Sequence, residues 1–405
     1  MINVEEIRKD FPILGRKIEG KPLVYLDSAA SAQRPRQVIE AVKHFWENSN
    51  ANVARSLHTL AEEATAEYET ARKKTAAFIG ANENEIIFTK NTTEAVNVVM
   101  RGYGEKFIGS RDTVTTSIME HHSNFVPWQW LAKKKSAKFE VINVTAEGLL
   151  DESEFDKIDK SNLLAITMAS NVLGTINDVR KLCKRAHETG ALVFVDAAQA
   201  APGMRVNVQE LGCDFLAFSG HKMMAPFGIG VLYGRKKLLE EMDPFLYGSE
   251  MIRKVSIEES EWNELPHKFE AGTPAVDAAV GLAAAIDYIN NIGVDNIRKH
   301  EMTLTKQAME MLDGVGAKML GPGKAEQRTG LVAFSLDGIH PHDVAVLLNA
   351  EGIAIRSGHH CAMPAHTCLG LPQGTNRASF YIYNSPEDIQ ALEDGIKKVK
   401  KIFSK

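Results

Sequence analysis

Short apolar runs alternate with amphipathic stretches over the first part of the chain. We interpret the runs as buried strands, because each is brief, continuous and bounded by a turn signal. They cover residues 23–26, 86–89, 114–118, 163–168, 191–195, 215–218 and 229–233. Amphipathic helices are predicted at 35–46, 59–78, 91–100 and 178–189. Strands that alternate with helices indicate an α/β fold with a mostly parallel sheet covered on both faces.

The pattern changes towards the C-terminus. Residues 234–270 look irregular, a helix-rich section follows over about 276–312, and after 321–323 the chain reads as a smaller α+β unit. In that unit we expect strands at 331–336, 353–357 and 377–383 and helices at 342–350 and 386–403. We therefore predict a large domain over 23–290 and a small domain over 291–405, with the segment 1–22 associated with the small one.

Composition narrows the class of protein. The chain has 405 residues, of which 44% are hydrophobic and 24% charged, as in ordinary globular proteins. A net charge of -5 argues against nucleic acid or an anionic membrane as a partner. Four cysteines are too few for a disulfide framework, and the acidic N-terminus does not resemble a secretory signal. We expect a cytoplasmic protein.

Polar residues follow the predicted strands at their carboxyl ends. They are Thr92, His121, Asn171, Asp196 and Lys222. Parallel sheets place their sites along that edge, so one shared site explains the five positions better than independent placement does.

Lys222 follows a buried strand, where its charge is costly. Either its stem lets the amine reach water, or burial lowers its pKa and frees the amine to attack a carbonyl group. Asp196 offers a carboxylate that can keep a pyridinium nitrogen protonated. Gln199 can donate to a ring oxygen, and His121 can lie on the ring face. The pair His121 and His122 lacks a third ligand at metal-binding spacing.

A phosphate site is the second component. Thr92 and Thr93 begin a predicted helix, where hydroxyls and free backbone N–H groups bind anions, although a plain helix cap is the simpler alternative. Ser219 and His221 can join them. Phosphate, ring cation and amine together describe pyridoxal 5'-phosphate (PLP).

These residues form motifs of a known family. Asp196-x-x-Gln199 followed by Ser219-Gly220-His221-Lys222 resembles the aminotransferase class V group of fold-type I PLP enzymes. The sequence from Arg356 to Ala362, RSGHHCA, resembles more closely the group II, SufS-type, cysteine desulfurases. The similarity extends almost from end to end.

The resemblance implies a fold-type I PLP transferase, with a large, mostly parallel seven-stranded sheet domain and a smaller α+β domain. It implies conversion of L-cysteine to L-alanine with a persulfide on Cys361, for iron–sulfur cluster assembly. The acceptor would be a SufE-like protein, a zinc-bound SufU-like protein or an iron–sulfur scaffold. A selenocysteine lyase needs the same site, and a non-catalytic assembly scaffold is the alternative outside the enzymes.

The resemblance also implies roles for single residues. Lys222, Cys361 and His121 would be catalytic. The cofactor would be bound by Thr92, Thr93, His121, Asn171, Asp196, Gln199, Ser219, His221 and Lys222, and by Thr273 from the other subunit of a homodimer. The substrate would be bound by Ala29, Asn171, Arg356 and Arg377, and no resident metal is expected.

The chain departs from the family pattern at Ala54, at 225–228 and at 365–370. The first two departures affect cofactor contacts and the loop after the lysine, and the third affects how the tip around Cys361 meets its acceptor. The predicted helix 342–350 begins with His340-Pro341-His342, which resembles the same segment in family members that pass sulfur to a zinc-bound partner. In that case His342 would help to dock the partner.

Cys361 has three interpretations. It can be an inert buried thiol, or a zinc ligand with His360, His366 and Cys368. It can also be a nucleophile, since Arg356, His359 and His360 supply positive charge or a base. The third fits best with the mobile loop that we expect over 357–370.

Overall fold

A seven-stranded sheet is the largest element of the computed structural model, which describes residues 2–54 and 56–404. Its strand order is β4-β10-β9-β8-β7-β5-β6. The strands are β4 (Ile86–Thr89), β5 (Thr113–Ser117), β6 (Lys138–Ile142), β7 (Leu163–Thr167), β8 (Leu192–Asp196), β9 (Phe215–Ser219) and β10 (Gly230–Gly234). The predicted α/β fold with a large, mostly parallel sheet is confirmed.

Strand direction decides which residues share an edge. The strands β9, β8, β7, β5 and β6 run parallel to one another, whereas β10 is antiparallel to both of its neighbours, β9 and β4. The strand β4 therefore points the same way as the parallel set. Its carboxyl end, with the helix start at Thr92, lies at the same edge as Asp196 and Lys222.

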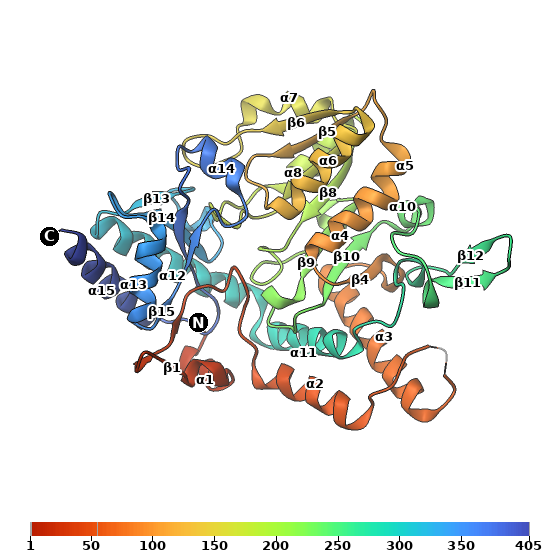
Figure 1. The fold of residues 1–405 in the computed structure, drawn as a ribbon, viewed down its shortest axis with the longest axis horizontal. Coiled ribbons are helices and arrows are strands. Elements are labelled where there is room, and N and C mark those ends of the chain that lie inside the picture. Colours follow the sequence, from red (N-terminus) through yellow and green to blue (C-terminus); the bar gives the residue numbers. More distant parts are fainter. Residues whose placement is uncertain (1, 55, 405) are drawn as a thin grey trace.

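Alternating residues of the strands pack on opposite faces, as the two-residue period of a strand requires. Leu164 and Ile166 of β7 belong to a core with α3, α8 and α11, while Leu163 and Ala165 belong to a second core with α4 and α6. Helices therefore cover both faces of the sheet (Figure 1). The helices are α2 (Arg36–Asn48), α3 (Thr59–Ile79), α4 (Thr92–Val99), α6 (Val126–Lys135), α8 (Val179–Glu188), α10 (Lys236–Glu241) and α11 (Val276–Ile292).

A second, antiparallel sheet forms the C-terminal part, at the blue end of Figure 1. Its order is β13-β14-β17-β16, and α12, α13 and α15 pack with it in one core. The elements are α12 (Val294–Gly314), β13 (Lys318–Leu320), β14 (Leu331–Ser335), α13 (Pro341–Ala350), β15 (Ile353–Ala354), β16 (Arg356–Gly358), α14 (Met363–Cys368), β17 (Thr375–Ser379) and α15 (Pro386–Phe403).

Some elements differ from the sequence predictions. The edge strand β6 was not predicted, because Lys138 and Glu140 interrupt its apolar run. The predicted strand at 23–26 is outside the large sheet: β3 (Val24–Tyr25) pairs with β15, and Leu26 packs in the core of the C-terminal part. The predicted strand at 353–357 is two strands, since β15 pairs with β3 and β16 with β17.

Two segments expected to be irregular contain regular structure. Residues 234–270 include α10 and the projecting hairpin of β11 (Ile252–Val255) and β12 (Ser260–Trp262). The segment 357–370 includes the short helix α14. Across the described residues, no helix combines the length and the apolar character that crossing a bilayer requires.

Candidate active site

One cavity of about 240 Å³ lies at the carboxyl edge of the large sheet, and β16 and β17 of the small sheet also contribute to it. It is lined by Ala29, Ala30, Asn91, Thr92, Thr93, His121, Ser123, Thr167, Ala169, Asn171, Asp196, Ala198, Gln199, Ser219, His221, Lys222, Arg356 and Arg377. Every predicted site residue is in this set except Cys361 and Thr273.

Lys222 and Asp196 come from neighbouring strands. Asp196 ends β8 and is buried, and one of its carboxylate oxygens accepts a hydrogen bond from Ala198 N at 2.8 Å. Lys222 follows β9 on a single 3-10 turn. Burial lowers the pKa of Lys222 to about 8, and the Asp196 carboxylate opposes that shift. About a tenth of the amine is therefore neutral at pH 7, far more than for an ordinary lysine, and an attacking amine must be neutral.

His121 is a neutral ring of defined tautomer. Its Nδ1 accepts a hydrogen bond from Ser123 N at 3.0 Å, so its proton is on Nε2. Burial lowers its pKa to about 3, and the charge of Lys222 acts in the same direction. The ring can therefore lie against a planar ligand without adding positive charge.

Glu120 supports this corner and was given no role from the sequence. It is buried, and its carboxyl group accepts hydrogen bonds from Ser117 Oγ at 2.5 Å, Asn124 Nδ2 at 2.7 Å and Thr167 N at 3.0 Å. Burial raises its pKa to about 8. The contacts tie β5 to β7 just before His121. Only its position next to His121 signalled it, since burial cannot be read from one residue.

Hydroxyl groups gather at the start of α4. Thr92 N donates to Ser219 Oγ at 2.9 Å, and the Thr92 and Ser219 hydroxyls are 2.7 Å apart. Thr93 Oγ1 contacts Ser123 Oγ at 2.6 Å. Asn91 caps the helix by accepting from Glu94 N at 3.0 Å, so the plain cap and the anion site coexist. Hydroxyls beside a helix N-terminus suit a phosphate group.

The loop after Lys222 contains one of the departures from the family pattern. Phe227 is 68% exposed and stacks on His221 with ring centroids 5.6 Å apart. The guanidinium carbon of Arg34 lies 4.3 Å from the centre of the Phe227 ring. His221 is thus fixed between the loop and the cavity. Burial lowers the pKa of His221 to about 4, with Lys222 and Arg34 adding to the effect.

Arg377, on β17, presents a buried guanidinium. Its Nη1 donates to Asn171 O at 2.7 Å, and its Nη2 donates to Asp27 Oδ1 at 3.1 Å. Burial lowers the pKa of Arg377 while Asp27 raises it. These two bonds use two of the five N–H donors, and the others, among them the buried and unpaired Nε–H, can hold a carboxylate, a group for which arginine geometry is well suited.

Gln199 and Ala29 close another side of the cavity. Gln199 Nε2 donates to Ala29 O at 2.8 Å, and Ala29 N donates to Ser379 Oγ at 2.9 Å. The amide group of Gln199 is therefore held in place by the segment that precedes α2.

Cys361 lies next to the cavity, on the segment between β16 and α14. Its Sγ is 3.4 Å from Arg356 Nη2, and its carbonyl oxygen accepts from His122 N at 2.7 Å. The zinc alternative finds no support: among residues 2–54 and 56–404, no group of three or more His, Cys, Asp or Glu side chains is placed to bind a metal ion. His360 and His366 both contact Thr375 Oγ1 instead.

Thr273 is exposed and does not line the cavity of its own chain. Its role at a partner's cofactor stays a prediction.

Buried polar atoms without partners test the fit to PLP. Within the described residues, His221 Nδ1, Asn171 Oδ1 and Arg377 Nε are buried and make no hydrogen bond. All three residues line the cavity, so a polar ligand would satisfy atoms that are otherwise costly to bury. The amine of Lys222 suits the aldehyde of PLP, and the carboxylate of Asp196 suits its ring nitrogen. The flat imidazole of His121 suits the ring face, and the hydroxyl cluster at the start of α4 suits the phosphate. The residues fit the cofactor.

Comparison with known proteins gives the class. The sequence model of the aminotransferase class-V family matches residues 24–392. The chain therefore belongs to this family, whose members use PLP.

Curated relatives specify it further. A probable cysteine desulfurase of Streptomyces coelicolor is 49% identical, with 100% of this chain and 98% of the relative covered. A cysteine desulfurase of Haloferax volcanii is 44% identical with the same coverage.

Solved structures agree. The apo cysteine desulfurase of Thermococcus onnurineus has a TM-score of 0.94 at 43% identity, covering 99% of this chain and 98% of that one. The cysteine desulfurase CsdA of Escherichia coli has a TM-score of 0.91 at 36% identity, covering 99% of both chains. Within its family, the chain belongs with the cysteine desulfurases.

Proposed function

We propose that this protein converts L-cysteine to L-alanine with PLP and keeps the sulfur as a persulfide on Cys361. The carrying observation is the arrangement of one cavity. The amine of Lys222, the carboxylate of Asp196 and the guanidinium of Arg377 line it, while a thiol lies beside it within 3.4 Å of Arg356. A non-catalytic scaffold has no need of this set.

When bound, PLP supplies an electron sink for negative charge at the substrate Cα. Lys222 would hold the cofactor covalently, and its Nζ would accept the proton from the substrate Cα and later return it. Asp196 would hold a proton on the ring nitrogen, and Gln199 would hold the ring edge. His121, with its proton on Nε2, would cover the ring face. The phosphate would be bound by Thr92, Thr93, Ser219 and His221.

The substrate is oriented by its carboxylate. Arg377 pairs with this group through the N–H donors that Asn171 O and Asp27 leave free. Asn171 and Ala29 complete the contacts on that side. Arg356 lines the cavity and also lies near Cys361 Sγ, so it can interact with the substrate and with the thiolate.

Sulfur leaves by transfer to Cys361. The Cys361 thiolate attacks the sulfur of L-cysteine, an S–S bond forms, and the Cβ–S bond breaks. The electron pair of the broken bond goes to Cβ, which takes up a proton and becomes the methyl group of L-alanine. One of the two thiol protons ends on Cβ and the other on the persulfide, so L-cysteine plus enzyme thiol equals L-alanine plus enzyme persulfide.

Further proposals concern subtype and assembly. The RSGHHCA segment supports the group II, SufS-type, subtype. We assign the small domain to residues 291–405 with 1–22 associated, and the large domain to 23–290 apart from residues 24–26, which pair and pack with the C-terminal part. Exposed Thr273 would reach the phosphate in the other subunit of a homodimer. We place the protein in the cytoplasm.

The acceptor is the last component of the proposal. A SufE-like protein, a zinc-bound SufU-like protein or an iron–sulfur scaffold would take the persulfide sulfur. His342, on α13, supports the zinc-bound class, since a Cβ added at Gly358 on β16 would lie 3.9 Å from His342 Nε2. The ring is thus close to the strand that leads to Cys361.

An assay of L-alanine and sulfide formation from L-cysteine tests the function. We expect both products with a reductant present, more of them with a competent acceptor, and a loss of both in Cys361→Ala. Selenocysteine in place of cysteine separates the lyase alternative. Alanine formation only from selenocysteine would contradict the proposal.

A further inference from the structure

The turn that carries Cys361 has an unusual backbone. His360 and Cys361 have φ values of 50° and 59°, in the left-handed region, and Gly358 has a φ of 102°. Side chains other than glycine are rare there, and two in succession persist only when their surroundings hold them. Something must therefore fix the thiol in place.

Residues that follow strands of the large sheet hold the backbone of the turn. Asn171 Nδ2 donates to His360 O at 2.6 Å, and His122 N donates to Cys361 O at 2.7 Å. Met363 N donates to His122 Nε2 at 3.0 Å. These contacts attach the turn to the large sheet. They do not involve the side chain of His360.

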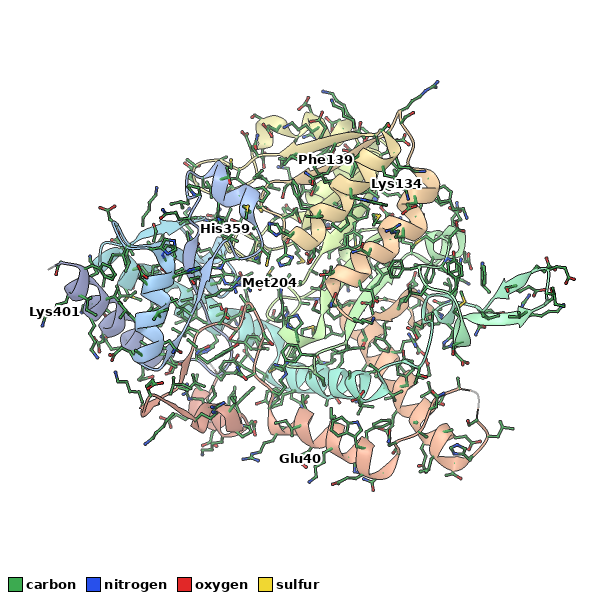
Figure 2. All side chains as sticks on the ribbon, viewed as in Figure 1. Glu40, Lys134, Phe139, Met204, His359 and Lys401 are labelled. Carbon is green, nitrogen blue, oxygen red and sulfur yellow. The ribbon has the colours of Figure 1, made fainter. Side chains whose placement is uncertain are left out.

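Three buried side chains connect the turn to α14 and β17 in one chain of hydrogen bonds. His366 Nδ1 is 3.0 Å from Ala362 O, and His366 Nε2 is 3.1 Å from Thr375 Oγ1. His360 Nε2 is 3.0 Å from the same hydroxyl. His366, His360 and Thr375 are buried, so water does not compete for these contacts. Figure 2 labels His359, the residue before His360, near the blue helix α14 of Figure 1.

The chemistry of the atoms fixes the direction of every bond. A carbonyl oxygen only accepts, so His366 carries its proton on Nδ1 and its Nε2 accepts the Thr375 hydroxyl proton. The Thr375 oxygen then accepts from His360 Nε2. His360 Nδ1 is left unprotonated, and it is buried without a partner in the described part of the chain. Burial lowers the pKa of His360 to about 2 and that of His366 as well, so both rings are neutral.

The strand that anchors this chain also carries the substrate site. Thr375 and Arg377 are two residues apart on β17 and therefore face the same side of it. His366 lies on α14, in the segment that departs from the family pattern. One strand thus sets the distance between the proposed carboxylate site and the sulfur nucleophile.

We propose that His366 and Thr375 are positioning residues, which hold the His360–Cys361 turn through this directional chain and so place the Cys361 thiolate for attack. The inference rests on the proposed role of Cys361. Neither residue needs to touch the substrate or the cofactor.

The test compares Thr375→Val with Thr375→Ser in the holoenzyme. Valine keeps the shape and removes the hydroxyl, whereas serine keeps the hydroxyl. For Thr375→Val we expect persulfide formation in a single turnover to fall by about 10- to 100-fold, as a small misplacement of a reacting group does. KM for L-cysteine should stay within about twofold, because this substitution leaves substrate binding intact. Thr375→Ser should restore the rate.

Hydrogen–deuterium exchange of the peptide 357–370 gives the second readout. Amides of the turn should exchange about tenfold faster in Thr375→Val and in His366→Asn, since local opening becomes easier. The matched control is Thr305→Val, which removes a buried hydroxyl on α12 that contacts Thr329 O at 3.4 Å. It should change neither readout.

Two results would overturn the positioning role. The first is that Thr375→Val changes neither hydrogen–deuterium exchange of the turn nor the rate of persulfide formation. The second is that Thr305→Val or Thr375→Ser loses as much of that rate as Thr375→Val does. A persulfide on another cysteine would instead contradict the proposed function, and the exchange comparison would still decide the positioning role.

Discussion

The site has two parts that are built in different ways. We call the strand ends of the large sheet the first wall, and the C-terminal segments that carry Arg377 and the adjacent Cys361 the second wall. Lys222, Asp196 and His121 follow strands of one parallel set, and their positions depend on strand ends that lie side by side. Cys361 and Arg377 belong to the C-terminal part. There the backbone of Cys361 is left-handed, and contacts from distant segments hold it.

The difference separates two tasks. A cofactor needs a rigid set of partners, which adjacent strands supply at little conformational cost. A nucleophile that must meet the substrate and then an acceptor cannot be fully enclosed, and Cys361 is half-buried on the turn between β16 and α14. Damage to the first wall should abolish cofactor chemistry, whereas damage to the second should leave the cofactor bound.

The largest effect should follow Lys222→Ala. Loss of the attacking amine and of the group that moves the Cα proton should lower turnover by about 10³- to 10⁴-fold, in the upper range for a general base. Borohydride reduction of the wild type followed by peptide mapping should place the pyridoxyl group on Lys222. The control is Lys268→Ala, another buried lysine, which donates to Leu239 O and Glu240 O outside the cavity. Label on a different lysine would contradict the cofactor assignment.

Asp196→Ala should have the next largest effect. Without the carboxylate the ring nitrogen loses its proton, and we expect kcat to fall by about 10²-fold or more, as for removal of a charge-stabilising group. The protein should still fold and bind phosphate through Thr93 and Ser219. Asp214→Asn is the matched control, because Asp214 is buried and contacts His187 and Val193 N away from the cavity. Normal turnover in Asp196→Ala would show that the ring is held in another way.

The pH dependence of cofactor attachment tests the first wall in the wild-type protein, without removing a side chain. Only the neutral amine of Lys222 attacks, and its pKa is about 8. The rate of PLP attachment to apoprotein should rise about tenfold per pH unit below that value and level off above it. Asp196 raises the pKa of Lys222, so the midpoint should move to lower pH in Asp196→Ala. A midpoint above 10 in the wild type would contradict a buried, activated lysine.

The smallest effect concerns the stability of the second wall. Gly374 and Gly370 both have positive φ, but a Cβ at Gly374 would overlap the carbonyl group of Gly358, whereas space around Gly370 is open. Gly370→Ala should cost about 1–2 kcal/mol from the backbone alone. Gly374→Ala should cost about 1–3 kcal/mol more because β16 must shift. Denaturant unfolding measures both, and equal costs would show that β16 tolerates movement.

The two walls also differed in how far the sequence could predict them. Strand ends of one parallel set share an edge whatever their spacing along the chain, so Thr92, Asp196 and Lys222 were correctly grouped. His360 and His366 were grouped only as possible zinc ligands, and their shared contact with Thr375 could not be foreseen, because it depends on how α14 packs on β17. The strand β6 was missed because an edge strand keeps polar residues. The strand at 23–26 was grouped with the large sheet because an apolar run alone does not indicate which strand it pairs with.

Mass spectrometry of the persulfide tests the central claim most directly. Enzyme incubated with L-cysteine and no acceptor is trapped by alkylation and digested, and added sulfur is assigned to single cysteine peptides. We predict one added sulfur on the Cys361 peptide, and none on it in Cys361→Ala, whose cofactor should remain bound. Added sulfur on Cys368 instead, retained in Cys361→Ala, would contradict the account.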